Sequence, residues 1–345
     1  MKKFAVLAVF AAVSVSAQAQ SAVTLFGTLD VNARYVKNGD NSLKSLSSDG
    51  VSSSRFGVRG VEDLGDGLQA GFWLESAVGA DEGAAGETTR FWNRRSTVSL
   101  LSNFGEVRLG RDEVPTYPGA SDYDAFGTAG VATGNKFITT QKLGTAVDTL
   151  KRADNQISYF TPNSLGGFYG RASVAAGEGI AGRKYIGGRA GYAKGPLNVS
   201  LSYGQTTVAP ATNGDDKYKM FALGASYDFS VVKLSGYYTQ QKFAARQLAV
   251  FNLGAQVPVG QAGVVRVSYA NANASGSGTD LNDANQFAVG YLHNLSKRTA
   301  LYATAARVNN KGTANYVVAA APALPVPNTL GKDSTGFEFG VRHSF

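Results

Sequence analysis

TGFEFGVRHSF, residues 335–345, alternates between apolar side chains and polar or small ones. Phe337, Phe339 and Val341 fall on one face of an extended chain, and Glu338 falls on the other. A side-chain period of two is that of a β-strand with one apolar and one polar face. The segment therefore predicts a strand that borders an apolar phase on one side and water on the other.

The same period recurs along most of the chain, as in LNVSLSYG (197–204) and KMFALGASYDF (219–229). The composition agrees, since Gly, Tyr and Phe are abundant and Pro is scarce. We predict sixteen strands, which begin near Ala22, Ser54, Leu68, Arg90, Gly105, Asp154, Gly167, Lys184, Leu197, Tyr218, Val231, Arg246, Gly263, Ala284, Thr299 and Thr335.

The connections between these strands come in two sizes. Short ones predict tight turns at 64–67, 102–105, 163–167, 195–196 and 295–298. Long ones alternate with them at 37–53, 79–89, 115–152, 208–217, 273–283 and 310–334. Short turns at one end and long loops at the other are typical of an outer-membrane β-barrel. A soluble sandwich or propeller would also alternate, but its inner face would be crowded with large apolar residues.

The first residues have the order of a secretory signal peptide. Lys2 and Lys3 precede an apolar run over 4–15, and Ala17-Gln18-Ala19 follows it. We expect cleavage after Ala19, which divides the chain into a signal peptide (1–19) and one barrel domain (20–345). The mature segment has no uninterrupted apolar run near the 18 residues of a membrane helix.

The residue inventory argues against several kinds of chemistry. The chain has no cysteine and only two histidines, His293 and His343. Neither histidine lies beside a nucleophile motif, and GxSxG is absent. We therefore expect no enzymatic activity, no cofactor and no His- or Cys-based metal site, although an acidic long loop such as GADEGAAGE (79–87) could hold a divalent cation weakly.

A closed barrel pairs its last strand with its first and so leaves no edge. We expect the strand at 335–345 to pair with the strand that begins near Ala22. Phe345 would then stand at the rim of the membrane, with the apolar face of the strand toward lipid.

Segments spread over the whole mature chain resemble the trimeric general porins of Gram-negative bacteria, and most of all their anion-selective, β-proteobacterial type. The segments are VTLFGTLD, SSRFGVRGVEDLGDGLQAGFWLE, FWNRRSTVSLLSNFGEVRLGRD, NQISYFTPNSLGGF, GYLHNLSKRTALY and GFEFGVRHSF. The resemblance implies a 16-stranded antiparallel transmembrane barrel in a homotrimer. It also implies that the third long loop, 115–152, folds inward and narrows the pore. A final aromatic residue such as Phe345 resembles the signal read by the barrel assembly machinery.

The positions of the arginines on the strands indicate which ions the lumen would favour. An arginine on the lipid face near mid-membrane costs about 2–4 kcal/mol, which favours inward placement. Arg34, Arg59 and Arg108 fall on polar faces, and Arg55 shares the face of Arg59. Inward cations in a narrow channel with low-dielectric walls raise the local concentration of anions.

The resemblance implies a selectivity filter made of Arg55, Arg94 and Arg152, facing the inward loop. Strict alternation with Val98 instead sends Arg94 toward lipid, so its orientation stays open. Each arginine could also be a solvated cation at the end of a strand. Asp122 and Asp124 in the loop could temper the basic field or form simple Asx turns.

We therefore predict an outer-membrane porin for passive diffusion of small hydrophilic solutes and ions, with a preference for anions. The alternative is a substrate-specific channel for organic acids or phosphate, and a purely structural barrel would conduct no ions. The expected partners are outer-membrane lipid, lipopolysaccharide, the assembly machinery and small anionic solutes, with no nucleic acid.

Overall fold

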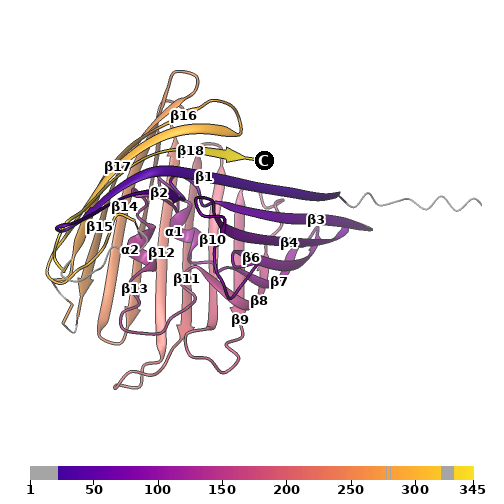
Figure 1. Cartoon of the computed structure of the whole chain (residues 1–345). Coiled ribbons are helices and arrows are strands. Elements are labelled where there is room, and N and C mark those ends of the chain that lie inside the picture. Colours follow the sequence, from indigo (N-terminus) through magenta and orange to yellow (C-terminus); the bar gives the residue numbers. More distant parts are fainter. Residues whose placement is uncertain (1–21, 277, 280, 320–329) are drawn as a thin grey trace, which may run out of the picture.

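The computed structural model describes residues 22–276, 278–279, 281–319 and 330–345. The expected signal peptide, 1–19, lies outside the described residues. None of the helices in the described part of the chain has the length and hydropathy needed to span a bilayer. The described structure is one large antiparallel sheet with two short helices within it (Figure 1).

Eighteen strands are present in the described ranges. They are β1 (Ala22–Asn38), β2 (Asn41–Ser48), β3 (Arg55–Gly65), β4 (Leu68–Gly79), β5 (Ala84–Ala85), β6 (Arg95–Ser102), β7 (Gly105–Glu113), β8 (Arg152–Phe160), β9 (Phe168–Ala175), β10 (Lys184–Lys194), β11 (Leu197–Thr207), β12 (Lys217–Asp228), β13 (Lys233–Phe243), β14 (Arg246–Val259), β15 (Gly263–Ser275), β16 (Ala284–Asn294), β17 (Thr299–Asn310) and β18 (Ser334–Ser344).

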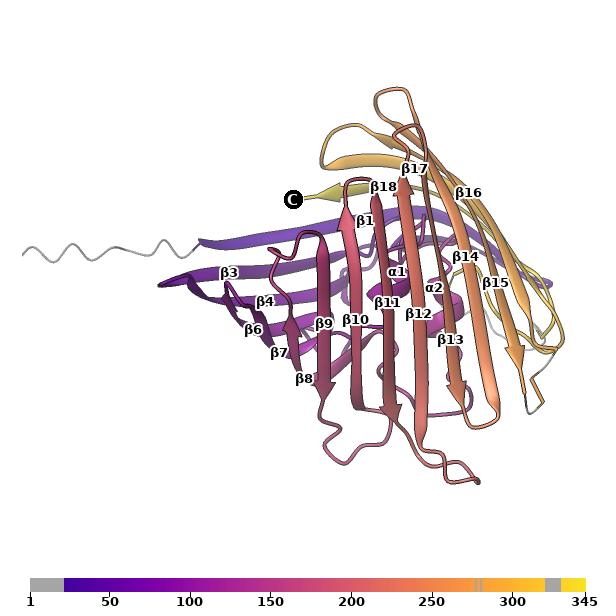
Figure 2. The same ribbon diagram turned by 180° about the vertical axis from the view of Figure 1, so that it is seen from behind.

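The sheet closes into a barrel between its first and last strands. β1 and β18 pair antiparallel from Thr28↔Ser344 to Asn38↔Ser334. Beyond β18, Gly27 and Phe345 exchange two backbone hydrogen bonds of 3.1 and 3.0 Å. The predicted closure is thus confirmed. In both views the strands curve around a common interior (Figures 1 and 2).

The two halves of β1 have different neighbours on its other edge. Residues 22–28 pair with β3, and residues 31–38 pair with β2. β2 and β3 together therefore occupy one position in the barrel, and β5 is a two-residue bridge to β4. Without β2 and β5, sixteen barrel strands remain, which is the number that the alternation predicted.

Two predicted boundaries were wrong. The segment 37–53 is no loop, because a turn at Gly39 (φ 57°) folds Asn41–Ser48 back onto β1. The strand expected near Arg90 begins at Arg95. The side-chain oxygen of Asn93 accepts the backbone N–H of Ala77 at 2.9 Å, and thereby takes a place that a ladder carbonyl would otherwise fill.

The two faces of the strands separate as their alternation predicted. On β18, Phe337, Phe339 and Val341 are exposed on the outside, and Glu338 between them is buried. The same division holds on β6, where Val98 is exposed and Thr97 is buried. The outer wall is therefore apolar and the inner wall polar, as a membrane channel requires.

The long segment between β7 and β8 lies inside the barrel and carries α1 (Pro118–Ser121) and α2 (Asn135–Thr139) (Figure 2). It is hydrogen-bonded to the inner wall at several points. The Val131 N–H donates to Glu338 on β18 at 3.3 Å, and Gln286 on β16 donates to the Ala132 carbonyl at 2.6 Å. The Phe137 side chain is fully buried. These contacts fix the segment against the wall.

Candidate selectivity site

Arg55 and Arg94 lie close together because they share one carboxylate. Arg55 is the first residue of β3, and Arg94 directly precedes β6. On β4 between them, the Glu75 Oε1 is 2.5 Å from the Arg94 Nε and 3.6 Å from the Arg55 Nε. The Trp73 indole N–H donates to the other Glu75 oxygen at 3.1 Å. One acid therefore offsets two arginines only in part.

Arg152, the first residue of β8, completes the group. Its Nε donates to the backbone carbonyl of Arg94 at 2.7 Å, and its Nη2 is 2.8 Å from Glu113 Oε1. Next to it, burial and the guanidinium groups of Arg152 and Arg94 lower the pKa of Lys151. The structure thus brings the three arginines of the expected filter together, with Glu75 and Glu113 as their acidic partners.

The ion pair with Glu75 places the Arg94 side chain on the inner side of the wall. The alternation argument assumed that Arg94 belongs to the same strand as Val98. In the structure the strand begins one residue later, at Arg95, and the Arg94 N–H donates to the Glu75 carbonyl at 3.1 Å. Because Arg94 lies outside the regular ladder, its parity does not decide its direction.

Arg34 lies on the inner wall, but it is fully engaged there. It is buried, and its Nη2 is 3.2 Å from Glu338 on β18. The same nitrogen donates to the carbonyls of Ser48 and Asp49, both at 3.2 Å. Arg34 therefore ties β1 to β18 and to the end of β2, and presents little free charge to a solute.

Arg59 lies apart from the three filter arginines. Its guanidinium carbon is 4.9 Å from the ring centroid of Trp73 and 5.3 Å from that of Phe26. Cation–π contacts hold an arginine without neutralising it. Arg59 thus adds positive charge to the wall near the short turns.

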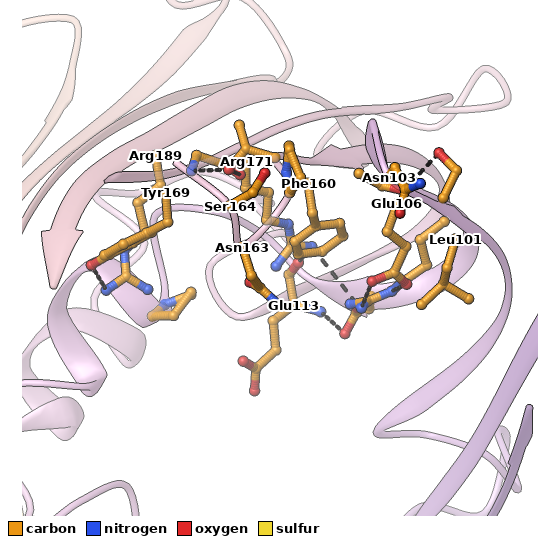
Figure 3. A pocket seen from close by; sticks show the side chains of 18 of the residues that line it. Leu101, Asn103, Glu106, Glu113, Phe160, Asn163, Ser164, Tyr169, Arg171 and Arg189 are labelled. Carbon is orange, nitrogen blue, oxygen red and sulfur yellow. Dashed lines mark hydrogen bonds and ion pairs between the residues drawn. The ribbon is translucent and has the colours of Figure 1, made fainter. Parts of the chain in front are cut away.

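Arg108 lines a cavity of about 700 Å³ on the side of the short turns. Figure 3 shows Glu106, Phe160 and Arg171 in the lining of this cavity. Four arginines and three acids line this cavity, and they are Arg95, Arg108, Arg171, Arg189, Glu106, Asp112 and Glu113. The Arg108 guanidinium forms two hydrogen bonds with Glu106, of 2.8 and 2.9 Å, and one of 2.6 Å with Asp112.

Aromatic rings order the arginines of this cavity. The ring centroid of Phe160 is 4.0 Å from the guanidinium carbon of Arg108 and 4.7 Å from that of Arg171. Figure 3 shows Tyr169 beside Arg189 in the same way. The arginines are held as a fixed row and not as flexible surface cations.

The two aspartates of the inward segment have different surroundings. Asp122 is exposed and accepts a hydrogen bond from Arg189 Nη1 at 2.7 Å. Asp124 is buried and accepts the backbone N–H groups of Phe126 and Gly134 at 2.9 and 2.7 Å. Burial raises the pKa of Asp124 to about 6. Asp122 thus offsets a cation of the pore, and Asp124 shapes the loop.

Lys136 on α2 is a further charge of the segment. Its Nζ donates to Gln286 Oε1 at 2.5 Å and to the Val131 carbonyl at 2.8 Å. Burial lowers the pKa of Lys136 to about 7, with partial opposition from the carboxylates of Asp124 and Glu338. The two hydrogen bonds of the Lys136 amine fasten the loop to the wall, whereas burial disfavours its charged form.

Sequence reasoning missed Asp112 and Glu113 as partners of the arginines. A register shift between Gly110 (φ 122°) and Asp112 disturbs the alternation of β7 at this point. A bulge of this kind cannot be read from side-chain period alone. By contrast, Arg95 shares parity with Thr97 and could have been placed inward. No group of three or more possible metal ligands occurs among the residues that the structure describes.

Comparisons with known proteins agree with this geometry. A family model described as Gram-negative porin matches residues 5–313. Outer membrane porin protein 32 of Delftia acidovorans is 41% identical, with all of both chains covered. An outer membrane porin protein of Bordetella pertussis is 29% identical over 86% of this chain and 91% of its own. An anion-selective porin from Comamonas acidovorans superimposes with a TM-score of 0.82 at 39% identity, covering 94% of this chain and 100% of that one.

Proposed function

Since the chain belongs to the Gram-negative porin family and forms a pore across the outer membrane, we propose that this pore prefers anions and that Arg55, Arg94 and Arg152 set the preference. The name of the Comamonas relative supports the selectivity. The family and the fold point to a channel and not to an enzyme. Small hydrophilic solutes and ions cross it by passive diffusion.

The sharing of Glu75 between Arg55 and Arg94 is the observation that carries this proposal. Together with Arg152 and Glu113, the group holds three positive charges against two negative ones. A net positive charge beside a narrow aqueous path stabilises a chloride ion and repels potassium. The acids fix the guanidinium groups in place, so the field does not depend on flexible side chains.

The inward segment 115–152 acts in this proposal as the constriction. One cavity of about 700 Å³ lies on the side of the short turns, and another of about 620 Å³ lies on the side of the long loops. Lys136 and Lys151 line the second cavity. Anions would thus meet basic side chains on both sides of the filter, with Asp122 and Asp124 on the loop between.

We further propose that the channel is a homotrimer in contact with outer-membrane lipid and lipopolysaccharide. The segment 1–19 acts as the signal peptide and is removed. Phe345 is read by the barrel assembly machinery, and its exposed ring, which packs over Gly27, remains accessible from the membrane side.

A substrate-specific channel for organic acids or phosphate remains the second candidate. The row of arginines around Phe160 favours it, since fixed guanidinium groups bind carboxylates and phosphates in two-pronged fashion. A specific channel would show current block by micromolar amounts of one such anion, and a general pore would show none.

The test of the proposed function is a reversal potential in a planar bilayer under a KCl gradient. We expect a voltage of the sign that chloride preference gives, reduced in Arg55→Ser and Arg152→Ser. A preference of the unmodified channel for potassium would overturn the proposed filter.

A further inference from the structure

Four lysines form a row on the outer face of the barrel, near the long-loop ends of β10, β12 and β13. They are Lys184, Lys217, Lys219 and Lys242. In the strand register Lys184 and Lys217 both stand opposite Thr207 of β11, from its two sides. Lys219 stands directly opposite Lys242. The row therefore runs across four neighbouring strands.

The pairing of Lys219 with Lys242 is unfavourable in isolation, because like charges directly opposite each other destabilise a sheet. Nearby acids offset the row only in part. Asp216 is 3.2 Å from the Lys217 amine, and Asp215 is 4.0 Å from that of Lys219. Within the described ranges, no carboxylate lies within 4.0 Å of the Lys242 or Lys184 amine.

An apolar groove of about 400 Å³ adjoins the row. Its floor includes Ile157, Val174 and Ile186, which are 53%, 46% and 60% exposed on the outer wall. Lys184 and Lys217 belong to its lining. A hydrocarbon groove next to fixed amines fits a molecule with an acyl chain and an anionic head.

The long loops of outer-membrane barrels face the cell exterior, so the row lies at the level of the outer leaflet. Strands about 4.8 Å apart give the row from β10 to β13 a width of about 14 Å, room for two phosphates on one head group. We propose that the lysine row and the groove bind the lipid A part of lipopolysaccharide, with its phosphates on the amines and an acyl chain along Ile186.

This site rests on the outer-membrane placement of the proposed function and not on the anion preference. The two can therefore be tested separately. Lipid binding is measured on channels in detergent and the reversal potential on channels in a planar bilayer, so a failure of one leaves the other measurable.

The experiment compares binding of purified bisphosphorylated lipid A to full-length mature channels in detergent, by native mass spectrometry. The test variant is K219Q/K242Q, and the matched control is K194Q/K297Q. The control removes two exposed cations at the short-turn end of the barrel. With roughly 1 kcal/mol for each lysine near an anionic lipid surface, we expect at least about tenfold weaker binding in the test variant. The control should bind as the unmodified channel does.

Two further measurements test whether the variant is folded and which lipid is bound. K219R/K242R keeps the charges and should keep the binding, which separates charge from a folding defect. Lipid A without phosphates should bind weakly to the unmodified channel. Equal binding of phosphatidylglycerol and lipid A, with equal loss of both in K219Q/K242Q, would overturn the choice of lipid A. Unchanged binding of lipid A in K219Q/K242Q would overturn the site itself.

Discussion

Replacement of Arg55 by serine removes one charge from the filter with little damage to its frame. Of the three filter arginines, Arg55 has the most exposed side chain, at 32%. Its distance of 3.6 Å from Glu75 is longer than the 2.5 Å between Glu75 and Arg94. Glu75 therefore keeps its closer partner in R55S, and the net charge of the group falls from one positive to zero.

The size of the effect follows from Coulomb's law. A unit charge about 5 Å from a permeating ion contributes about 0.8 kcal/mol in a water-filled path. It acts with opposite signs on chloride and potassium, so their difference changes by about 1.6 kcal/mol. Screening with a Debye length of about 10 Å at 0.1 M salt leaves about 1 kcal/mol. The ratio of chloride to potassium permeability should thus fall about fivefold.

The assay is the reversal potential of single channels across a tenfold KCl gradient, at a mean concentration of about 0.1 M. Lys297→Ser serves as the control, since it removes an exposed cation in a turn outside the pore. The control should leave the permeability ratio unchanged. If R55S conducts normally and its ratio stays within a factor of 1.5 of the unmodified value, the electrostatic reasoning fails.

Three other perturbations follow from the same geometry. In Glu75→Gln, which leaves Arg55 and Arg94 without their acid, the reversal potential should move toward stronger chloride preference, and a shift toward potassium would contradict the charge assignment. In Gly27→Leu, the new side chain meets the Phe345 ring and the Arg55 carbonyl. Such overpacking costs about 1–3 kcal/mol. It should lower the unfolding temperature of the barrel, measured as the temperature above which the protein no longer migrates on gels as the faster, folded form. Ala190→Leu on the exposed outer face should leave this temperature unchanged. The loop should dock more firmly as the pH rises from 7 to 10. Lys136 has a pKa of about 7 when docked and 10.5 when free, so the docked state binds fewer protons in this range and gains up to about 1.4 kcal/mol per pH unit. A nitroxide at K142C, in a chain with no other cysteine, should become less mobile over that range, and Lys136→Met should abolish the change.

The alternation of side chains predicted the strands and their two faces, and the two sizes of connection between the strands favoured a barrel. Over residues 337–341 of β18 and 199–203 of β11 every second residue is apolar, and these residues are more exposed than the ones between them. The alternation failed where side chains or turns replace the ladder. The side chain of Asn93 replaces a ladder carbonyl, so β6 begins later than expected. The turn at Gly39 folds an additional strand, β2, onto β1. These two departures depend on a single hydrogen bond and on a positive φ, and neither can be predicted from the side-chain period.

The filter was less predictable than the wall. Arg55 and Arg152 could be proposed from resemblance, and the parity of Glu75 with Trp73 suggested an acid on the inner wall that partners arginines, but which arginine each acid pairs with could not be identified from the sequence. Glu75 lies 19 residues from Arg94, and Glu113 lies 39 residues from Arg152. Such pairs arise from the register between strands, which the closed barrel imposes and which the local sequence does not contain.

The contacts of the inward loop also determine when the pore becomes narrow during folding. The loop precedes β8 in the chain, yet it binds Gln256, Gln286 and Glu338, which follow its contact residues by 131, 154 and 207 positions. Contacts between such distant residues form late, because the chain between them must first be ordered. The wall that receives the loop is therefore complete only when β18 has joined it. A half-assembled cylinder would be a wide, unselective leak, so insertion and ring closure must be nearly simultaneous if the cell is to keep its permeability barrier.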